Sequence, residues 1–279
     1  MAALSHVEPQ SRPQPPRTML QRLYRDNERF IIGGAALGAV LLIWELSART
    51  GLVDPLLISS PIAVARAGYT LFSEGEIWRD LEVSATEFLV GYGLAAAIGI
   101  PLGVATGRCR RASYLIGPFI DTLNAVPRLT LLPLIVIWFG IGIWSKVVVV
   151  FLGAVIPIAI STHSGVKTNE ARFLNVARSF GASEFKILSS IILPGTVPFI
   201  FSGLKYGSGR ALLGVVAGEL YAATAGIGFM IGNAGNNLRA DILFFGVLLF
   251  TAAGLVSVAV LDRFERRFET WRPKIGSAA

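Results

Sequence analysis

The chain has 279 residues, of which 53% are hydrophobic and only 15% are charged, and its mean hydropathy is +0.62. Soluble domains carry about a quarter of charged residues, so this composition excludes an ordinary soluble domain and indicates a membrane protein. The net charge of +7 could indicate nucleic acid, but the basic residues cluster between apolar segments, as topology signals do, so no nucleic-acid partner is expected.

This sequence contains few residues that could bind a metal ion or a cofactor. One cysteine, Cys109, excludes an internal disulfide, and two histidines with one cysteine cannot form a Cys/His metal cluster. No Gly-x-x-x-x-Gly-Lys-Ser/Thr loop is present to hold a nucleotide phosphate, and no catalytic group of residues stands out. We expect no cofactor and no enzymatic activity in this chain.

Residues 1–29 form a proline- and arginine-rich tail, which we expect to be partly disordered and cytoplasmic. An apolar segment follows from Phe30 to Leu46. Its length and the lack of an Ala-x-Ala-like site after it favour an uncleaved first transmembrane helix over a signal peptide. Together with an acidic outer segment it makes up residues 30–86, in which Ser59-Ser60-Pro61 predicts the start of a surface helix over 62–72.

The second span, Glu87–Gly107, has a small residue at every fourth position. Four-residue spacing places these side chains on one helix face, where another helix can approach closely. We therefore predict a helix-packing seam. Its residues are Gly91, Ala95, Gly99, Gly103 and Gly107.

The third span is predicted to be broken. Its halves, 114–125 and 129–143, contain Asp121 and Asn124, and Pro127, Arg128 and Pro133 interrupt it. Charges and prolines at membrane depth are tolerated where they face protein or a watery cavity. Two interpretations stay open: Asp121 and Arg128 neutralise each other near the headgroups, or this stretch lines a transport pathway. A turn at 144–146 then leads into a fourth span over 147–161.

A polar stretch, residues 165–190, interrupts the apolar segments. Apolar residues at helical spacing up to Phe180, a break at Gly181 and a possible N-cap at Ser183 predict a helix, a turn and a second short helix outside the bilayer core. The chain re-enters the membrane at 191–194.

The remainder of the chain supplies two more spans, 191–220 and 242–261, and a basic C-terminal tail, 263–279, so that the transmembrane domain covers 87–262. With the N-terminus inside, seventeen basic residues fall on cytoplasmic segments and five on outer ones. This asymmetry predicts six helices with both termini and the 165–190 loop in the cytoplasm.

The polar stretch resembles the cytoplasmic signature of ABC importer permeases, which reads Glu-Ala-Ala, three residues, Gly, nine residues, Ile, one residue, Leu-Pro. It departs from that pattern at the first two places, which hold Asn175 and Val176. The matching residues are Ala177, Gly181, Ile191, Leu193 and Pro194.

The resemblance extends over about 87–271 and points to the nitrate, sulfonate and taurine importer group. Before that range, Ser59-Ser60-Pro61 also resembles the Pro-Ser-Pro segment of this group, with Ser59 where proline would stand. Several stretches within the range resemble the group as well. These are Pro127, Pro133-Leu134, Trp138–Gly142, Ser145-Lys146, Gly203-Leu204, Gly209–Ala211, Glu219 and Gly226–Gly228.

This resemblance implies an all-α, type I importer permease fold with about six transmembrane helices in a bacterial inner membrane. It implies four partners: the lipid bilayer, a second permease copy in a homodimer, a separate ATP-binding cassette subunit that hydrolyses ATP, and an extracytoplasmic substrate-binding protein. Closure of the paired ATPase subunits would pull the coupling elements together and open the pathway outward.

By the same resemblance, the ATPase-coupling residues are Asn175, Ala177, Phe180, Gly181, Ala182, Phe185, Leu193 and Pro194. Phe180 and Phe185 would fill the ATPase cleft, or else pack against this chain's own inner face. Asn175 lacks the charge of the signature glutamate, so an ion pair made by that glutamate should be absent. Candidate pathway residues are Asn124, Arg128, Arg210 and Glu219.

Two other classes of protein remain in view. An ion-coupled secondary transporter could share broken helices, but the halves of this chain show no convincing self-similarity. An intramembrane enzyme would need paired acids at one depth, whereas Glu87, Asp121 and Glu219 appear isolated along the sequence. The expected substrate is a small anion, such as an organic sulfonate, with nitrate, taurine or a neutral pyrimidine precursor as alternatives.

Overall fold

The computed structural model describes residues 28–168 and 176–268, all of the regular structure there being helical. The predicted N-terminal tail, Asn175 and the end of the C-terminal tail lie outside the described residues. The chain divides into two compact units, Met1–Val53 and Asp54–Ala279. Within the described residues, five helices are long and apolar enough to cross a membrane, or six if one bent helix pair is counted as a span, which agrees with the predicted fold class.

The first unit contains one described helix, α2 (Glu28–Arg49). Its apolar residues occur all round, and Leu37, Leu42 and Ile43 are each more than half exposed within the structure. A helix that is apolar on every side needs a lipid or protein environment. The helix predicted over this segment is therefore present, and it is long and apolar enough to cross a membrane.

The second unit begins with the short helix α3 (Pro55–Ile58) and the amphipathic helix α4 (Pro61–Glu74). Ser60 caps α4, because its hydroxyl accepts a hydrogen bond from the Ala63 amide at 3.2 Å. The predicted surface helix and its start signal are thus confirmed. The buried face of α4, which includes Gly68, packs on Phe245 of α13.

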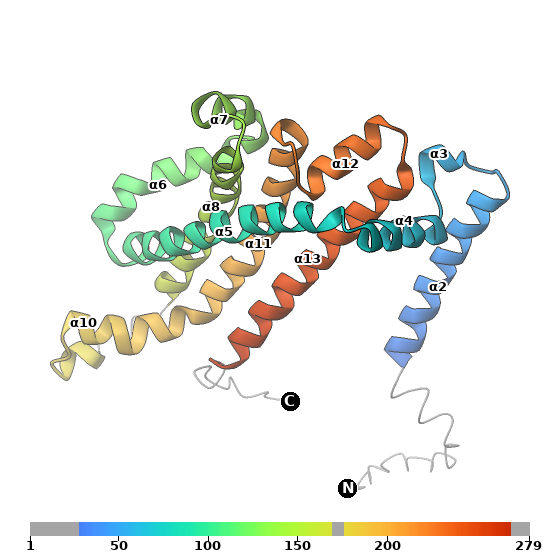
Figure 1. Ribbon diagram of the computed structural model, residues 1–279. Coiled ribbons are helices and arrows are strands. Elements are labelled where there is room, and N and C mark those ends of the chain that lie inside the picture. The colour runs from blue at the N-terminus through green and yellow to red at the C-terminus, as the bar shows by residue number, and fades with distance from the viewer. Residues whose placement is uncertain (1–27, 169–175, 269–279) are drawn as a thin grey trace, which may run out of the picture. The chain divides into compact units, whose positions relative to one another are not determined.

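Three long helices form the centre of this unit (Figure 1): α5 (Ile77–Arg108), α8 (Ile143–Thr168) and α11 (Leu193–Ala222). The helix α8 packs against both of the others. The core residues Val150, Ala154 and Ile158 of α8 are fully buried together with Ala95 of α5 and Ala211 of α11.

The small-residue ridge of α5 lies against α8 along its whole length. A Cβ added at Gly99 would come within 2.9 Å of the Val155 carbonyl oxygen, and one at Gly103 within 2.6 Å of that of Ala159. Gly91 and Gly107 meet Val150 and Val166 in the same way. A second row on α11, which includes Gly203 and Gly214, lies against the other side of α8. Because glycine has no side chain, the helix backbones can approach closely, and the dispersion contacts that result hold the three helices together.

Two sequence boundaries were wrong, and one helix was not predicted. The helix α5 begins at Ile77, ten residues before the predicted start of span two, and its first turns are tied to a distant segment because the Asp80 carboxylate accepts a hydrogen bond from the Gly226 amide. The predicted turn at 144–146 belongs to the first turns of α8, where Ser145 and Lys146 are buried. The segment over 221–241, between the last two predicted spans, contains a further helix, α12 (Ile227–Asn236).

The predicted break is confirmed: α6 (Arg110–Ala125), a 3₁₀ turn over Arg128–Leu131 and α7 (Leu132–Phe139) follow one another with a bend of 87°. The residue before a proline avoids the helical region, and Val126 accordingly caps α6 in an extended conformation ahead of Pro127.

The last helix, α13 (Ala240–Arg266), packs on α11, α12 and α4. Lys205 of α11 forms ion pairs with Asp262 and with Glu265, the second at 2.5 Å. The Lys205 ammonium group is therefore paired with carboxylates of this same protein, so Lys205 is not an unpaired charge at membrane depth.

Candidate functional site

The polar stretch folds as a helical hairpin, which we define as residues 176–192. Residues 176–179 are helical, a turn follows at 180–181, and a short helix, α10, covers Glu184–Ile187. This matches the predicted helix, turn and helix. In Figure 1, α10 projects at one end of the second unit.

Gly181 closes the first helix of the hairpin. Its φ is +74°, a left-handed conformation in which glycine is favoured. The Ala182 amide donates to the Ala177 carbonyl at 3.0 Å, and the Gly181 amide donates to that of Arg178 at 2.9 Å. These two bonds make a Schellman motif, so the turn is set by local chemistry.

Ser183 starts the second helix as predicted. Its hydroxyl accepts a hydrogen bond from the Lys186 amide at 3.3 Å, and Glu184 occupies the first turn. The Glu184 carboxylate also pairs with Arg178 at 3.2 Å and with Arg108 at the end of α5. The hairpin is thereby tied to α5 as well as to the two helices that it joins in sequence.

The inner side of the hairpin is apolar and packed. Ile187 and Ile192 are buried against Val166 of α8, and four partly buried residues surround them: Val104, Ala177, Ala182 and Leu188. Ala177 and Ala182, predicted among the coupling residues, therefore face this chain's own helices. They shape the hairpin and do not stand on its outer surface.

The outer side of the hairpin exposes two aromatic rings. Phe180 is 87% exposed and Phe185 is 79% exposed. The alternative that these rings pack against the chain's own inner face is wrong for this structure. Both rings are therefore open to contact with lipid or with another protein.

Leu193 and Pro194 join the hairpin to α11 through a widened turn. Residues Leu188–Ile192 are π-helical, and the Leu193 amide donates to the Leu188 carbonyl five residues earlier. A proline ring in a regular helix would clash with the carbonyl four residues before it, and the wider turn accompanies this proline.

Two of the predicted pathway residues lie together. Asn124 and Arg210 both line a groove of about 620 Å³, which we call the α6–α8–α11 groove. The Arg210 guanidinium donates to the Tyr206 hydroxyl at 2.5 Å and lies over its ring, 5.1 Å from the centroid. The side chain of Arg128 lies outside the described part, although its neighbours Pro127 and Leu129 line the groove.

Glu219, the fourth predicted pathway residue, does not line this groove. It is 1% exposed, and its carboxylate accepts hydrogen bonds from the Ser84 hydroxyl and the Gly228 amide, both at 2.6 Å. The Ser84 hydroxyl in turn accepts from the Ile227 amide at 2.8 Å. The free amides at the start of α12 are thus capped by side chains from α5 and α11.

The predicted isolation of the acids was wrong for Glu87 and Glu219. Glu87 is fully buried and pairs with Lys146 at 3.0 Å, and both groups belong to the buried cluster around Glu219. These paired acids have no exposed surface for a substrate to reach. The cluster therefore holds α5, α8, α11 and α12 together and does not support an intramembrane enzyme.

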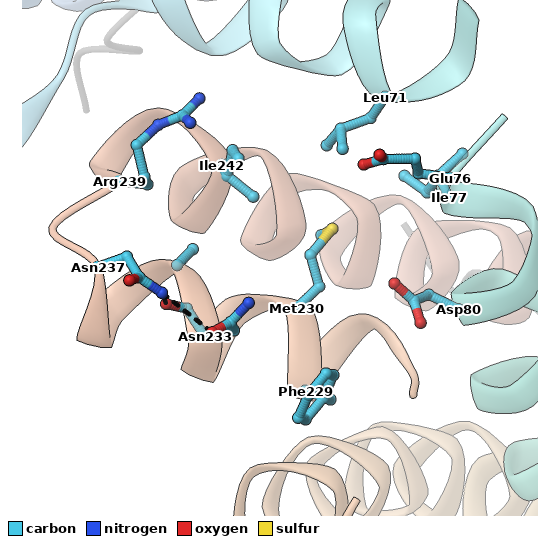
Figure 2. Close-up of a pocket in the computed structure, with 11 residues that line it drawn as sticks. Leu71, Glu76, Ile77, Asp80, Phe229, Met230, Asn233, Asn237, Arg239 and Ile242 are labelled. Atoms are coloured by element: carbon cyan, nitrogen blue, oxygen red, sulfur yellow. Dashed lines mark hydrogen bonds between the residues drawn. The ribbon is translucent and has the colours of Figure 1, made fainter. Parts of the chain in front are cut away.

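A second pocket, of about 530 Å³, lies at the end of α5 remote from the hairpin. Figure 2 shows the Glu76 and Asp80 carboxylates on one side of it, and Asn233 of α12 and Asn237, which follows α12, on another. The Asp80 carboxylate also accepts a hydrogen bond from the Gly226 amide at 2.7 Å.

Sequence reasoning missed the residues that secure these elements, namely Ser84, Lys146, Tyr206 and the Arg108–Glu184 pair. Only Tyr206 left a local signal, because it stands one helical turn before Arg210 on the same face. The others pair residues that are far apart in the chain.

Residues 99–270 match the family described as the binding-protein-dependent transport system inner membrane component. The chain belongs to this family. It is a multi-pass permease component of an ABC importer, in which a separate subunit is the ATPase.

Curated relatives agree with the family. The permease is 34% identical over 244 residues to the taurine transport system permease protein TauC of Escherichia coli, covering 86% of this chain and 89% of that protein. It is 30% identical over 240 residues to a putative aliphatic sulfonates transport permease protein SsuC of Bacillus subtilis, covering 86% and 87%.

The fold has a counterpart among solved structures. A chain of the MetNI methionine ABC transporter in inward-facing conformations superposes with a TM-score of 0.60 at 18% identity, covering 68% of this permease and 94% of that chain. At this identity the match shows the fold alone, and it agrees with the predicted importer permease fold.

Proposed function

We propose that this permease imports a small anion and that the 176–192 hairpin couples it to the ATP-binding subunit. The observation that supports this most directly is the pair of exposed rings, Phe180 and Phe185, on a hairpin whose opposite side is buried. A cleft in the ATPase that receives these rings could move the hairpin as one body.

The docking of the hairpin suits this role. Its inner side packs on Val104 and Val166, at the ends of α5 and α8, and Glu184 pairs with Arg108. Since the α5 ridge lies tightly on α8, a force applied to the hairpin would reach both helices together.

The proposed orientation places both termini and the hairpin in the cytoplasm. It is supported by the excess of basic residues on those segments. In this orientation the Glu76–Asp80 end of α5, with the pocket in Figure 2, faces the substrate-binding protein. The pathway would run between two copies of the chain.

The substrate proposal is an aliphatic sulfonate or taurine, with nitrate as an alternative. Its support is twofold: the relatives named above are permeases for taurine and aliphatic sulfonates, and Arg210 lies exposed midway along a membrane-spanning helix. A cation at that depth is costly against lipid and is expected to face a watery pathway.

The coupling proposal is tested with Phe180→Asp in the assembled importer. We expect the ATP-binding subunit to be lost on purification and uptake to fall at least about tenfold, because a charged side chain cannot occupy an apolar cleft. The matched control is Tyr69→Asp, since Tyr69 is 75% exposed on α4, away from the hairpin. Wild-type co-purification of the Phe180 variant would refute the coupling role.

A further inference from the structure

Among the residues whose side chains the structure describes, the α6–α8–α11 groove combines the cation of Arg210 with mainly apolar walls. These walls include Val149, Leu213, Ala217 and Leu220, and the described polar side chains are those of Asn124, Tyr206 and Arg210. At about 620 Å³ it lies in the size range of small-ligand sites.

Arg210 is the charged group of this groove whose position is known. Tyr206, Arg210, Leu213 and Ala217 follow one another at spacings of three and four residues, so they share one face of α11. No carboxylate within residues 28–168 and 176–268 forms an ion pair with Arg210, whereas Lys146 and Lys205 are both matched. An unmatched guanidinium at this depth favours an anionic ligand.

The same lining disfavours a ligand that also carries a positive charge. Aspartate and glutamate are absent from the described residues that line the groove. One face of the Tyr206 ring is occupied by the Arg210 guanidinium, whose positive charge would repel an ammonium group brought to the same ring. An ammonium group placed along Leu213 and Ala217 would therefore lose its hydration without gaining a partner.

We propose that this groove is a substrate-binding site within the permease itself, and that it selects a monoanion with an apolar chain over a zwitterion of the same size. The anionic head lies at Arg210, and the chain lies along Leu213 and Ala217. Of the substrates proposed above, an alkanesulfonate fits and taurine does not. This inference rests on the proposed transport of a small anion and adds a selectivity that the permease itself imposes.

The test measures protection of a cysteine placed in the groove. Leu213→Cys is introduced into the full-length permease, purified in detergent, and its alkylation rate is followed by mass spectrometry. The probes are propanesulfonate and taurine, which differ in that an ammonium group replaces the terminal methyl group. The native Cys109, exposed at the turn between α5 and α6, is the internal control and should react at the same rate with either probe.

We expect propanesulfonate to slow alkylation of the introduced cysteine at concentrations at least about tenfold lower than taurine. Adding Arg210→Gln should abolish the protection, and Arg210→Lys should restore part of it, because lysine keeps the charge but not the planar donors. Equal protection by both probes, protection that survives Arg210→Gln, or no protection at all would overturn the proposal.

Failure of this test is distinguishable from failure of the proposed function. Transport that depends on the ATP-binding subunit and on Phe180 could persist without a binding site in the groove, and then only the selectivity proposal would be wrong. Protection as expected in a chain that the ATP-binding subunit does not bind would leave the site intact and refute the coupling proposal instead.

Discussion

At the scale of single residues, the hairpin depends on one backbone conformation. Gly181 has a positive φ, and a Cβ added there would meet nothing within 4 Å. The cost of a substitution is therefore conformational rather than steric. Asparagine tolerates this region of backbone space, while a β-branched residue does not.

We predict that Gly181→Val reduces co-purification of the ATP-binding subunit, whereas Gly181→Asn largely preserves it. The left-handed conformation costs an ordinary residue about 1–2 kcal/mol, which is enough to shift the hairpin away from its docked form. Pull-down yields of the two variants at equal membrane expression provide the measurement. If both variants lost the ATP-binding subunit equally, the added side chain at position 181, and not the backbone conformation, would be what prevents binding.

Glu219 illustrates a residue whose role is structural rather than chemical. Its carboxylate satisfies the Ser84 hydroxyl and the Gly228 amide in a buried site. A Cβ added at Gly228 would come within 2.9 Å of one carboxylate oxygen, so glycine is needed there for close approach. Removing the acceptor leaves buried donors without partners.

We predict that Glu219→Ala lowers the thermal unfolding midpoint of the detergent-solubilised protein by about 5 °C or more, because each unsatisfied buried group costs about 1–3 kcal/mol. Glu82→Ala is the control, since Glu82 is exposed and lies on α5 two residues before Ser84, the hydrogen-bond partner of Glu219. A midpoint unchanged by Glu219→Ala, measured by differential scanning fluorimetry, would mean that the α12 cap contributes nothing to stability.

At the scale of elements, the α5 helix offers a matched pair of glycines. Gly103 meets Thr162 and the Ala159 carbonyl of α8, whereas a Cβ at Gly93 would meet nothing within 4 Å. Both glycines are in the helix interior, so the difference between them isolates the contact with α8 from helix propensity.

We predict that Gly103→Leu sharply reduces the yield of monodisperse protein, while Gly93→Leu leaves it at or above the wild-type level. A leucine at position 103 would push α5 away from the α8 backbone, which cannot retreat as a flexible side chain could. Fluorescence-detected size-exclusion chromatography compares the two variants. Similar profiles for both would contradict a packing seam.

Element ends were the weakest sequence predictions, and α5 shows why. Asp80 and Glu82 suggested a polar outer segment, yet α5 runs through them. Asp80 binds the Gly226 amide, which lies 146 residues away, so a charge that looks like a loop signal is a helix contact. The local sequence pattern around Asp80 does not show that its hydrogen-bond partner lies in the other half of the chain.

At the scale of the whole molecule, the remaining question is which end of the helices faces the cytoplasm. Cys109 is exposed at the same end of α5 as the hairpin, and Ser73 is exposed near the end of α4. These two positions flank the length of α5 and report the two sides of the membrane.

We predict that a membrane-impermeant maleimide labels Cys109 in inside-out vesicles and not in right-side-out spheroplasts. A Cys109→Ser, Ser73→Cys variant should show the reverse pattern. The physical basis is the excess of basic residues on the Cys109 side, which are held in the cytoplasm. Labelling of Cys109 from the outside would invert the topology and remove the hairpin from the reach of an ATPase.

The sequence by itself determined the features that depend on neighbours along the chain. These are the number of apolar spans, the break at Pro127, the caps at Ser60 and Ser183, the left-handed turn at Gly181 and the spacing of the α5 ridge. Each follows from backbone sterics, helix periodicity or a local hydrogen bond. The importer signature could also be recognised in the sequence because its residues lie within one short stretch of the chain.

Only the tertiary structure decided what each ridge, charge and ring meets. It buried Glu87, Lys146 and Glu219 together, placed Arg210 in a groove, and left Phe180 exposed while turning Ala177 inward. These outcomes depend on contacts between helices that are distant along the chain, as with Ser84 and Glu219, which are 135 residues apart. An unpaired charge is energetically costly at membrane depth, and the group that pairs with it lies on another helix, so the local sequence does not reveal the pair.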